Sequence, residues 1–395
     1  MINIIKKQNC CGCYACYNIC PQKCISMQSD NEGFWYPVVD IEECNDCGLC
    51  EKVCPVLNKK IVENHPVAYA CINKDNKIRE LSSSGGMFTI IAEKVIANNG
   101  VVFGAGFDDE FNVVHSWTDN LDGLSNFRGS KYVQSCIGNT YKQAKSFLKQ
   151  GKQVLFSGTP CQIAGLRSYF GKDYDGLICL DIVCHGVPSP KIWQIYKNYL
   201  EKVYQAKAQR ITFRCKNCGW KLYSVSLSFD NDTEYSQKFT ENIFMQGFLK
   251  NLYLRPSCYD CSFKTLNRQS DITLADFWGI QNVLPKFDDD KGTSLVFVNS
   301  TNGKSMFDQI KEKILYKEVD INQAVAYNSA ATKSVEQNPK REKFFKELDK
   351  ICFNKLVKKY CSDSVLMGIM RKAKSITRTV LKNTGLLNAI KRALS

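Results

Sequence analysis

A cysteine motif that occurs twice is the first feature of this sequence with clear chemistry. The spacing C-x2-C-x2-C-x3-C-P is found at Cys10, Cys13, Cys16 and Cys20, and again at Cys44, Cys47, Cys50 and Cys54. Three thiolates at this spacing can bind one 4Fe-4S cluster, while the fourth binds the other cluster. A zinc ribbon uses paired C-x2-C knuckles and leaves the third cysteine and the C-P pair unexplained.

The motif therefore predicts two clusters with crossed ligand sets. We call these the first site (Cys10, Cys13, Cys16 and Cys54) and the second site (Cys20, Cys44, Cys47 and Cys50). In each motif we expect the fourth cysteine to begin a helix that leads away from the loop.

The total of 21 cysteines also bears on the cellular compartment. The N-terminus lacks the apolar core of a signal peptide, and no stretch approaches the roughly 18 to 20 apolar residues of a membrane span. We expect a cytoplasmic protein, in which clustered thiols bind metal more often than they form disulfides.

Four further cysteines are expected at junctions between elements. In SGTPCQIAGL, Thr159 can cap a helix and Pro160 suits its first position, so Cys161 should lie in the first turn. The free amides of that turn would stabilise a thiolate or an anionic cluster. The other three junction cysteines are Cys184, Cys258 and Cys261. Together they are what a third 4Fe-4S cluster would require, and we call this set the third site.

Spacing alone does not bring these four residues together, so other interpretations remain open at this stage. Cys161 at a helix start, with His185 as a base, could form the nucleophile of a thiol enzyme. The four cysteines could also have unconnected structural roles.

The remaining cysteines have simpler interpretations. Small buried hydrophobic roles are expected for Cys11, Cys24, Cys71, Cys136, Cys179, Cys352 and Cys361. Cys215 and Cys218 in FRCKNCGWK are either two thiols on a surface hairpin turn, a further metal site, or a replacement pair for the third cluster.

The elements that must position these residues follow from hydrophobic periodicity. Strands are predicted at VAYACI, VVFGAGFD, VVHSW, QVLFSG, LICLDIVC, RITFR, YSVSLSF and SLVFVNS, and SSSGGMFTIIAEKVIANNG predicts a helix capped by serine. The fold class is α/β (α+β). Three domains are expected: residues 1–62 with two clusters, a larger unit over 65–335, and a basic helical tail over 336–395.

Several motifs resemble a known family. FSGTPCQIAGL, VCHGVPSP, RPSCYDCSFK, SDITLADFWGI and KGTSLVFVNS, preceded by SSSGG and RGSKYVQS, are similar to the C-terminal domain of the coenzyme F420 hydrogenase/dehydrogenase beta-subunit family. The N-terminal segment resembles a bacterial two-cluster ferredoxin. The resemblance to the beta-subunit family covers about residues 67–305. It implies FAD, a third cluster on Cys161, Cys184, Cys258 and Cys261, and transfer of electrons between the clusters and the flavin.

The motifs offer groups that a flavin dinucleotide needs. Backbone amides at a helix start can approach a pyrophosphate closely, as expected for Ser83, Ser84, Gly85 and Gly86. An ordinary serine cap is the alternative for that segment. Further candidates on loops are Ser130, Lys131, Tyr132, Gly158, Thr159, Lys291, Gly292 and Ser294. His185 and Asp276 are candidates for proton handling, and Trp278 could line the flavin or pack in the core. No G-x-G-x-x-G follows a strand, so a Rossmann nicotinamide site is not indicated.

Charge is concentrated at the C-terminal end. Residues 340–395 carry 15 Lys and Arg against 4 Asp and Glu, whereas the first 339 residues carry 38 against 35. An apolar helical face with basic flanks is predicted at Leu366, Ile369, Met370, Ala373, Ile376 and Val380. This helix could lie on an anionic membrane, dock on a partner or pack back on the body. Nucleic acid is a poorer fit because aromatic residues are nearly absent from it.

The sequence thus predicts an iron–sulfur flavoprotein oxidoreductase with three 4Fe-4S clusters and FAD. It would exchange electrons with a redox partner protein or a small-molecule donor or acceptor, and a hydride with a deazaflavin, a quinone or another organic substrate. The first alternative is a non-catalytic subunit that feeds electrons to a partner enzyme. The second is the Cys161/His185 thiol enzyme.

Overall fold

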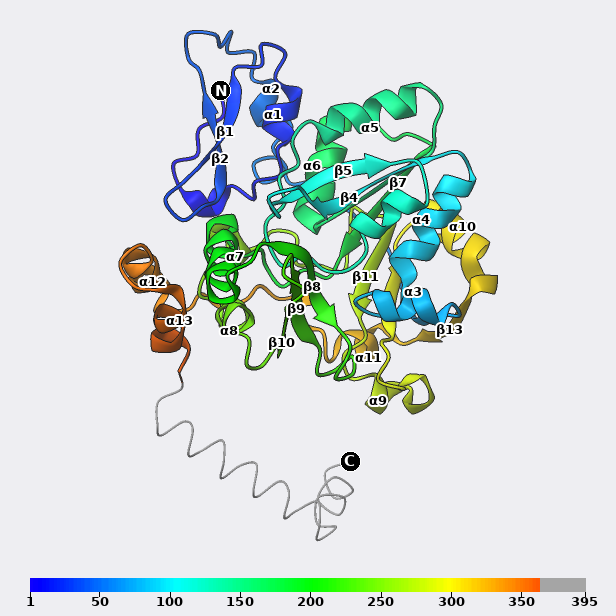
Figure 1. Cartoon of the computed structure of the whole chain (residues 1–395). Helices are drawn as coiled ribbons and strands as arrows, with labels where there is room; N and C mark the ends of the chain where they lie inside the picture. The colour runs from blue at the N-terminus through cyan, green and yellow to red at the C-terminus, as the bar shows by residue number, and fades with distance from the viewer. Residues whose placement is uncertain (363–395) are drawn as a thin grey trace, which may run out of the picture.

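The computed structural model describes residues 1–362 of the chain. Its architecture is mixed α/β, as predicted, with a small N-terminal segment packed on a larger unit (Figure 1). Within the described residues, the larger unit contains an eight-stranded sheet in the order β13-β3-β12-β11-β7-β6-β4-β5. Its strands are β3 (Val67–Asn73), β4 (Val101–Phe107), β5 (Val113–Thr118), β6 (Val154–Gly158), β7 (Leu177–Ile182), β11 (Ile272–Asp276), β12 (Ser294–Val298) and β13 (Ile314–Val319).

The four central strands of this sheet are parallel. β4 pairs with β6, β6 with β7, and β7 with β11, whereas the outer strands β5, β12, β3 and β13 are added in antiparallel pairs. Parallel strands that are covered on both faces read as continuous apolar runs, which explains QVLFSG and LICLDIVC. The carboxyl ends of the parallel strands therefore meet at one edge of the sheet.

Helices cover both faces of the sheet, and successive strand residues point to opposite faces. Val102 packs with α4 (Met87–Ala97) and α10 (Thr301–Ile310) on one face. Its neighbour Phe103 packs with α5 (Thr140–Lys149) and α6 (Pro160–Phe170) on the other. Shorter helices of this unit are α3 (Asn76–Leu81), α9 (Ile280–Val283) and α11 (Ile321–Val325).

The N-terminal segment contains α1 (Ala15–Ile19), β1 (Ile25–Ser29), β2 (Trp35–Val39) and α2 (Leu49–Lys52). β1 and β2 form an antiparallel pair. Tyr14 and Ala15 are buried in the same apolar core as α5 and α6, so this segment packs directly on the larger unit.

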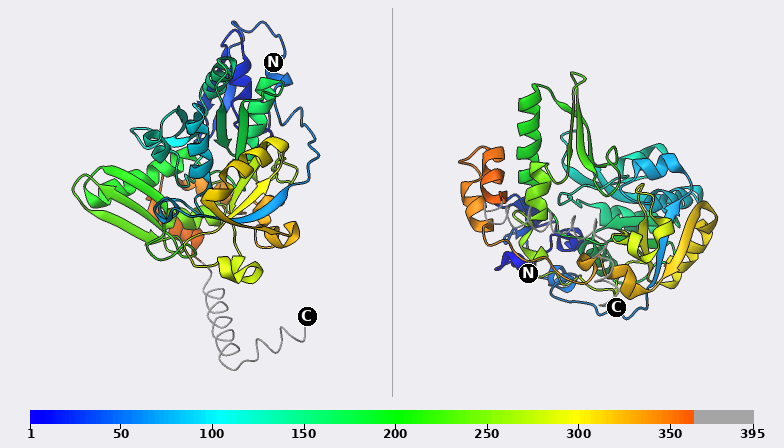
Figure 2. Two further views of the ribbon diagram at one scale, coloured as in Figure 1. Left: turned by 90° about the vertical axis from the view of Figure 1, so that its right-hand side faces the viewer. Right: turned by 90° about the horizontal axis from the view of Figure 1, so that it is seen from below.

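A second, three-stranded antiparallel sheet lies beside the large one (Figure 2). It consists of β8 (Ala208–Cys215), β9 (Ser224–Phe229) and β10 (Glu234–Lys238), and packs with α7 (Pro190–Tyr204) and α8 (Ile243–Leu249). The same core includes Phe344 of α12 (Arg341–Glu347) and Leu356 of α13 (Phe353–Cys361). Residues 341–361 therefore pack with the body of the protein. The division into domains at 62/65 and 335/336 stays a prediction.

Most predicted strands and helices are present, but the serine cap of α4 is wrong. α4 begins at Met87 after Gly86, which has a φ of 85° and provides no side-chain cap. Residues 82–86 instead form a loop between α3 and α4. Gly85 lies so close to the Cys71 carbonyl that an added Cβ would come within 2.4 Å of it, which explains a glycine here by close backbone contact.

Candidate functional site

The two crossed cysteine sets of the N-terminal segment each line one cavity. The first-site cysteines surround a cavity that Cys11 also lines, and the second-site cysteines surround another that Cys24 also lines. The helix expected after each motif lies inside it: α1 ends at Ile19 just before Cys20, and α2 contains Cys50 and ends before Cys54. The fourth cysteine thus follows a helix rather than beginning one. Ligation itself stays a prediction.

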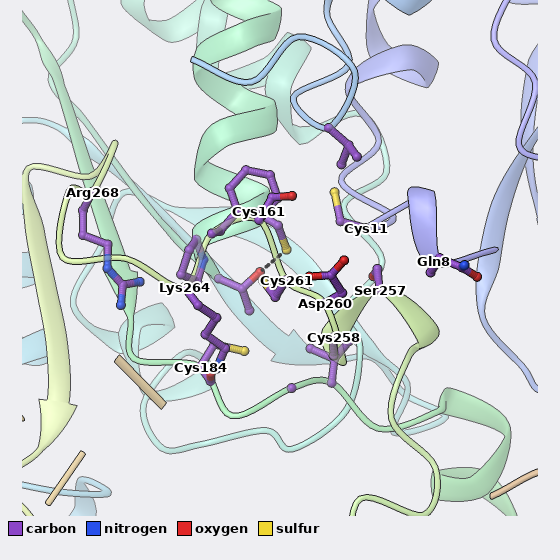
Figure 3. Close-up of a pocket in the computed structure, with 17 residues that line it drawn as sticks. Gln8, Cys11, Cys161, Cys184, Ser257, Cys258, Asp260, Cys261, Lys264 and Arg268 are labelled. Carbon is purple, nitrogen blue, oxygen red and sulfur yellow. Dashed lines mark hydrogen bonds between the residues drawn. The ribbon is translucent and has the colours of Figure 1, made fainter. Parts of the chain in front are cut away.

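The third-site cysteines also come together, from four separate parts of the chain. All of them line one cavity with about 600 Å³ of empty space, its open mouth included (Figure 3). Cys161 lies in the first turn of α6, where Thr159 and Gln162 form a capping box and Pro160 begins the helix, as predicted. Cys184 follows β7, the neighbour of β6 in the sheet, so both residues lie at the carboxyl edge. Cys258 ends a 3-10 turn and Cys261 follows in the next loop.

The third-site thiols are held in their protonated form in the absence of metal. Burial raises the pKa of Cys184 to about 12 and also raises the pKa of Cys261. The pKa of Cys161 is raised first by its contact with Cys11 and then by burial. Because a metal ligand must be deprotonated, binding of a cluster here would release protons.

These thiols argue against the Cys161/His185 nucleophile. A reactive cysteine needs a lowered pKa, and that of Cys161 is raised. His185 Nε2 is 2.8 Å from Asn251 Oδ1, whereas Cys161 Sγ is 3.2 Å from Thr159 Oγ1. The two residues that would have to form the pair thus have other partners, and His185 does not line the cavity.

No group of three or more Cys, His, Asp or Glu side chains within residues 1–362 is close enough to hold a single metal ion. A cubane presents its four irons at separate corners, so its ligands stand farther apart than those of one ion. Four cysteines around an open cavity fit the donor set and the size of a cluster better than those of a zinc ion.

The simple interpretation of the surplus cysteines needs correction. Cys24 is buried, but its Sγ lies 3.4 Å from that of Cys20 at the second site. Cys11 is half-buried and lines the cavities of both the first and the third site. Cys136 is half-buried, and Cys352, which stands just before α13, is exposed. Cys71, Cys179 and Cys361 are buried, as expected.

Most of the flavin candidates gather around one loop at the carboxyl edge. Ser83 Oγ accepts hydrogen bonds from the amide and the hydroxyl of Ser130 at 2.7 and 2.9 Å. The Gly85 amide donates to Ser294 Oγ at 3.0 Å, and Ser84 Oγ donates to the Thr293 carbonyl at 2.9 Å. An added Cβ on Gly292 would come within 2.7 Å of the Ser84 carbonyl oxygen. We call residues 82–86 with residues 291–294 the serine–glycine loop pair.

The other candidates lie farther along the same edge or point elsewhere. Gly158 and Thr159 are at the end of β6, and Thr159 lines the third-site cavity. Lys131 Nζ donates to the carbonyls of Asn126 and Arg128 at 2.7 and 3.1 Å. Tyr132 Oη lies 3.1 Å from Arg214.

Asp276 is held by two fixed partners. Its carboxylate accepts from Arg214 at 2.8 and 3.2 Å, and from the Trp220 indole at 3.0 Å. Trp220 in turn stacks on Trp278, with ring centroids 4.8 Å apart. A role for Asp276 in proton handling stays a prediction; the structure shows it anchoring a buried arginine.

Two basic side chains contact the serine–glycine loop pair, and one of them has only backbone carbonyls as partners. Arg79 pairs with Asp289, but Lys216 Nζ donates to three backbone carbonyls, those of Arg79, Ser84 and Lys291. Burial, together with Arg214 and Arg79, lowers the pKa of Lys216 to about 7. Burial and Arg128 also lower the pKa of Lys131 to about 7, but its ammonium group donates to the Asn126 and Arg128 carbonyls and not to the loop pair. Such groups gain from a bound anion, because it would restore their charged form.

Sequence reasoning missed Arg79, Arg214 and Lys216. A signal was present for the last two, because they flank Cys215 in FRCKNCGWK, a segment noted only for its thiols. Cys215 ends β8 and Cys218 lies on the exposed turn that follows. Neither residue lines the third-site cavity, so the structure favours the hairpin turn over a replacement ligand pair.

The basic helix predicted from Leu366 onward lies outside the described residues. Within residues 1–362, none of the helices has the length and apolar character that crossing a membrane would require.

Two family models match the chain. Residues 9–58 match a 4Fe-4S dicluster domain. Residues 151–324 match the C-terminal domain of the beta subunits of coenzyme F420 hydrogenase/dehydrogenase. All four third-site cysteines fall inside this second range.

Similar proteins match over shorter parts. An uncharacterized ferredoxin of Methanocaldococcus jannaschii is 35% identical over 52 residues, and a subunit I of NADH-quinone oxidoreductase from Geobacter metallireducens is 38% identical over 55. Each match covers 13% of this chain, and the chain spans 66% and 42% of those proteins. A chain of the F420-reducing NiFe hydrogenase complex from Methanosarcina barkeri has 15% identity and a TM-score of 0.46, covering 70% of this chain and 97% of that one.

Proposed function

We propose that this chain is an iron–sulfur flavoprotein oxidoreductase. The proposal is supported by the match of residues 9–58 to a 4Fe-4S dicluster domain and of residues 151–324 to the C-terminal domain of coenzyme F420 hydrogenase/dehydrogenase beta subunits. Electrons would pass between three 4Fe-4S clusters and FAD. A hydride would be exchanged with a deazaflavin, a quinone or another organic substrate, and single electrons with a redox partner in the cytoplasm.

The observation that carries this proposal is the match between ligand sets and cavities. The three cysteine sets predicted from the sequence each surround one cavity, and the two N-terminal sets do so with the crossed membership that a two-cluster ferredoxin requires. The third set joins residues as far apart in the sequence as Cys161 and Cys261, which unconnected structural cysteines would have no reason to do.

The charge and position of the serine–glycine loop pair support a dinucleotide. The loops lie at the carboxyl edge of the parallel strands, where open α/β sheets bind their ligands. Lys216 lacks a carboxylate partner among the described residues, so a pyrophosphate would complete its pairing. When bound, a flavin supplies the conversion between single electrons and a hydride, and the protein supplies its position and electrostatics.

The test is the cofactor content of the full chain purified without oxygen. We expect about twelve iron and twelve sulfide per chain, from three clusters of four, and one FAD. Cys258→Ser should lower the iron content by about four. Cys352→Ser, an exposed cysteine outside the three cavities, is the matched control and should leave it unchanged. About eight iron with no flavin would contradict the proposal, as would zinc in place of iron.

A second candidate function keeps the clusters but lacks a small-molecule substrate. The similarity to a subunit of NADH-quinone oxidoreductase favours a chain that feeds electrons to a partner enzyme. The two candidates are separated by turnover of the isolated, fully loaded chain with a deazaflavin, quinone or nicotinamide. Turnover supports the oxidoreductase, and its absence in the presence of all cofactors supports the electron-input role.

A further inference from the structure

Cys11 is the residue shared by the first and the third site. It lines both cavities, although it belongs to neither predicted ligand set. Its thiol lies within hydrogen-bonding reach of Cys13 on one side and of Cys161 on the other. Figure 3 shows it entering the third-site cavity from the N-terminal segment.

The helix α6 brings the two sites into contact independently of Cys11. Cys161 lies in its first turn, and Gly165 lies one turn later. A Cβ added to Gly165 would come within 2.9 Å of Cys13 Sγ, so the backbone of this helix touches a first-site cysteine. One helix therefore contacts both ligand sets.

Arg255 fixes the same junction from the other side. It is fully buried, and it donates to the Cys10 carbonyl at 2.8 Å and to the Trp35 carbonyl at 3.0 Å. It also precedes Cys258 by three residues, in the loop that supplies two third-site cysteines. A Cβ added to Gly12 would come within 3.0 Å of this guanidinium, so the backbone at Gly12 packs directly against Arg255.

The second site has no such connection. Its cavity is lined by residues 1–50 alone, and Cys47 is exposed to solvent. Among the three cysteine sets, only the first and the third are thus joined across the boundary between the N-terminal segment and the larger unit.

We propose that electrons cross this boundary at one place, from the first site past the Cys11 sulfur to the third site, and that the second site exchanges electrons with the external one-electron partner. Each step moves one electron from a reduced cluster to an oxidised one, with no bond made or broken. This order rests on the proposed function, because it requires all three clusters.

The order is tested by magnetic coupling between reduced clusters, measured by electron paramagnetic resonance on the full chain. Removing the first cluster with Cys16→Ser should abolish the coupling of the third cluster to its neighbour. Removing the second with Cys50→Ser should preserve it. The proposal fails if Cys50→Ser abolishes the coupling or Cys16→Ser leaves it intact. If the wild-type chain holds no third cluster, the proposed function fails instead.

The role of the Cys11 sulfur needs a separate variant. A reduced two-cluster ferredoxin serves as the one-electron donor, and reduction of the third cluster is followed by rapid freezing. Cys11→Ala should slow this step while leaving the iron content unchanged, and the slowing should exceed what any measured change in the potential of the third cluster accounts for. Cys136→Ala is the matched control: Cys136 lies 3.4 Å from Tyr14 Oη at the same boundary but lines neither cavity. Unchanged kinetics in Cys11→Ala, a loss of iron, or equal slowing in Cys136→Ala would each overturn the role.

Discussion

The protonation state of His115, a buried residue near the third site, is set by its surroundings. His115 is 7% exposed, its ring is stacked on Phe156 at 5.6 Å, and its Nε2 lies 3.0 Å from the Ser157 carbonyl oxygen. Burial lowers its pKa to about 4, against an ordinary value of 6.5. The imidazole is therefore neutral in the folded protein near pH 7, beside the end of the strand that leads to Cys161.

This shift makes stability depend on pH. Between pH 6.5 and 4 the unfolded chain protonates His115 and the folded one does not, so the free energy of unfolding falls as pH falls, by up to about 3 kcal/mol from this group. The measurement is the urea midpoint of the wild type and of His115→Gln from pH 7 to 4. The variant should have a shallower decline. Parallel curves for the two proteins would contradict the buried neutral imidazole.

At the scale of elements, local signals were enough for some features and insufficient for others. The cap, the proline and Cys161 of α6 were predicted because all the determinants lie within four residues. The cap of α4 was wrong because Gly85 is shaped by contacts outside its own segment, with Cys71 of β3 and with Ser294 of β12, which lies more than 200 residues away. The partners of Arg214 and Lys216 could not be assigned either, because Asp276 and the Ser84 carbonyl lie more than 60 residues away from them.

The helix α6 offers a test of the contact at Gly165. Alanine is intrinsically better than glycine inside a helix by about 1 kcal/mol. Here its Cβ would overlap Cys13, and overpacking costs about 1–3 kcal/mol. We therefore expect Gly165→Ala to lower the free energy of unfolding by about 1 kcal/mol. Urea unfolding is the measurement, with Ser168→Ala on the same helix as the control. A more stable Gly165→Ala would show that the helix and Cys13 are not in contact.

On the scale of the whole molecule, an ion pair connects α12, near the C-terminal end of the described residues, with the N-terminal segment. Arg341 of α12 forms a bidentate ion pair with Glu32 of the N-terminal segment and also donates to the Leu254 carbonyl at 3.0 Å. Leu254 precedes Arg255, which holds the Cys10 loop. Such long-range pairs could not be read from the sequence. The cysteine sets of the N-terminal segment and six of the eight strands of the large sheet could be read from it, whereas β11 and β13 were not predicted.

Removing the ion pair between Arg341 and Glu32 should increase local unfolding in both of the segments that it connects. Arg341 is 5% exposed, and Arg341→Ala leaves Glu32 without its partner, at a cost of about 1–3 kcal/mol. Hydrogen exchange should increase in residues 31–39 and 341–347 together. Arg341→Lys should restore the protection from exchange only in part, because a lysine cannot form a bidentate ion pair with a carboxylate. Lys340→Ala, at an exposed neighbour, should have no effect. Faster exchange in only one of the two segments would show that the pair does not couple them.

The grip of Arg255 and Arg341 on the N-terminal segment has a consequence for protein engineering. The stretch over residues 59–66 joins that segment to the sheet covalently, but the two arginines and the buried side chains of Tyr14 and Ala15 hold it in place. Lengthening this stretch should therefore leave the N-terminal segment docked on the larger unit. An unrelated ferredoxin fused at the same junction would lack the surface that contacts the larger unit, and it would remain attached only through the linker. A replacement for this segment would have to keep Glu32 and the backbone conformation that presents the Cys10 and Trp35 carbonyls, as well as the cysteines.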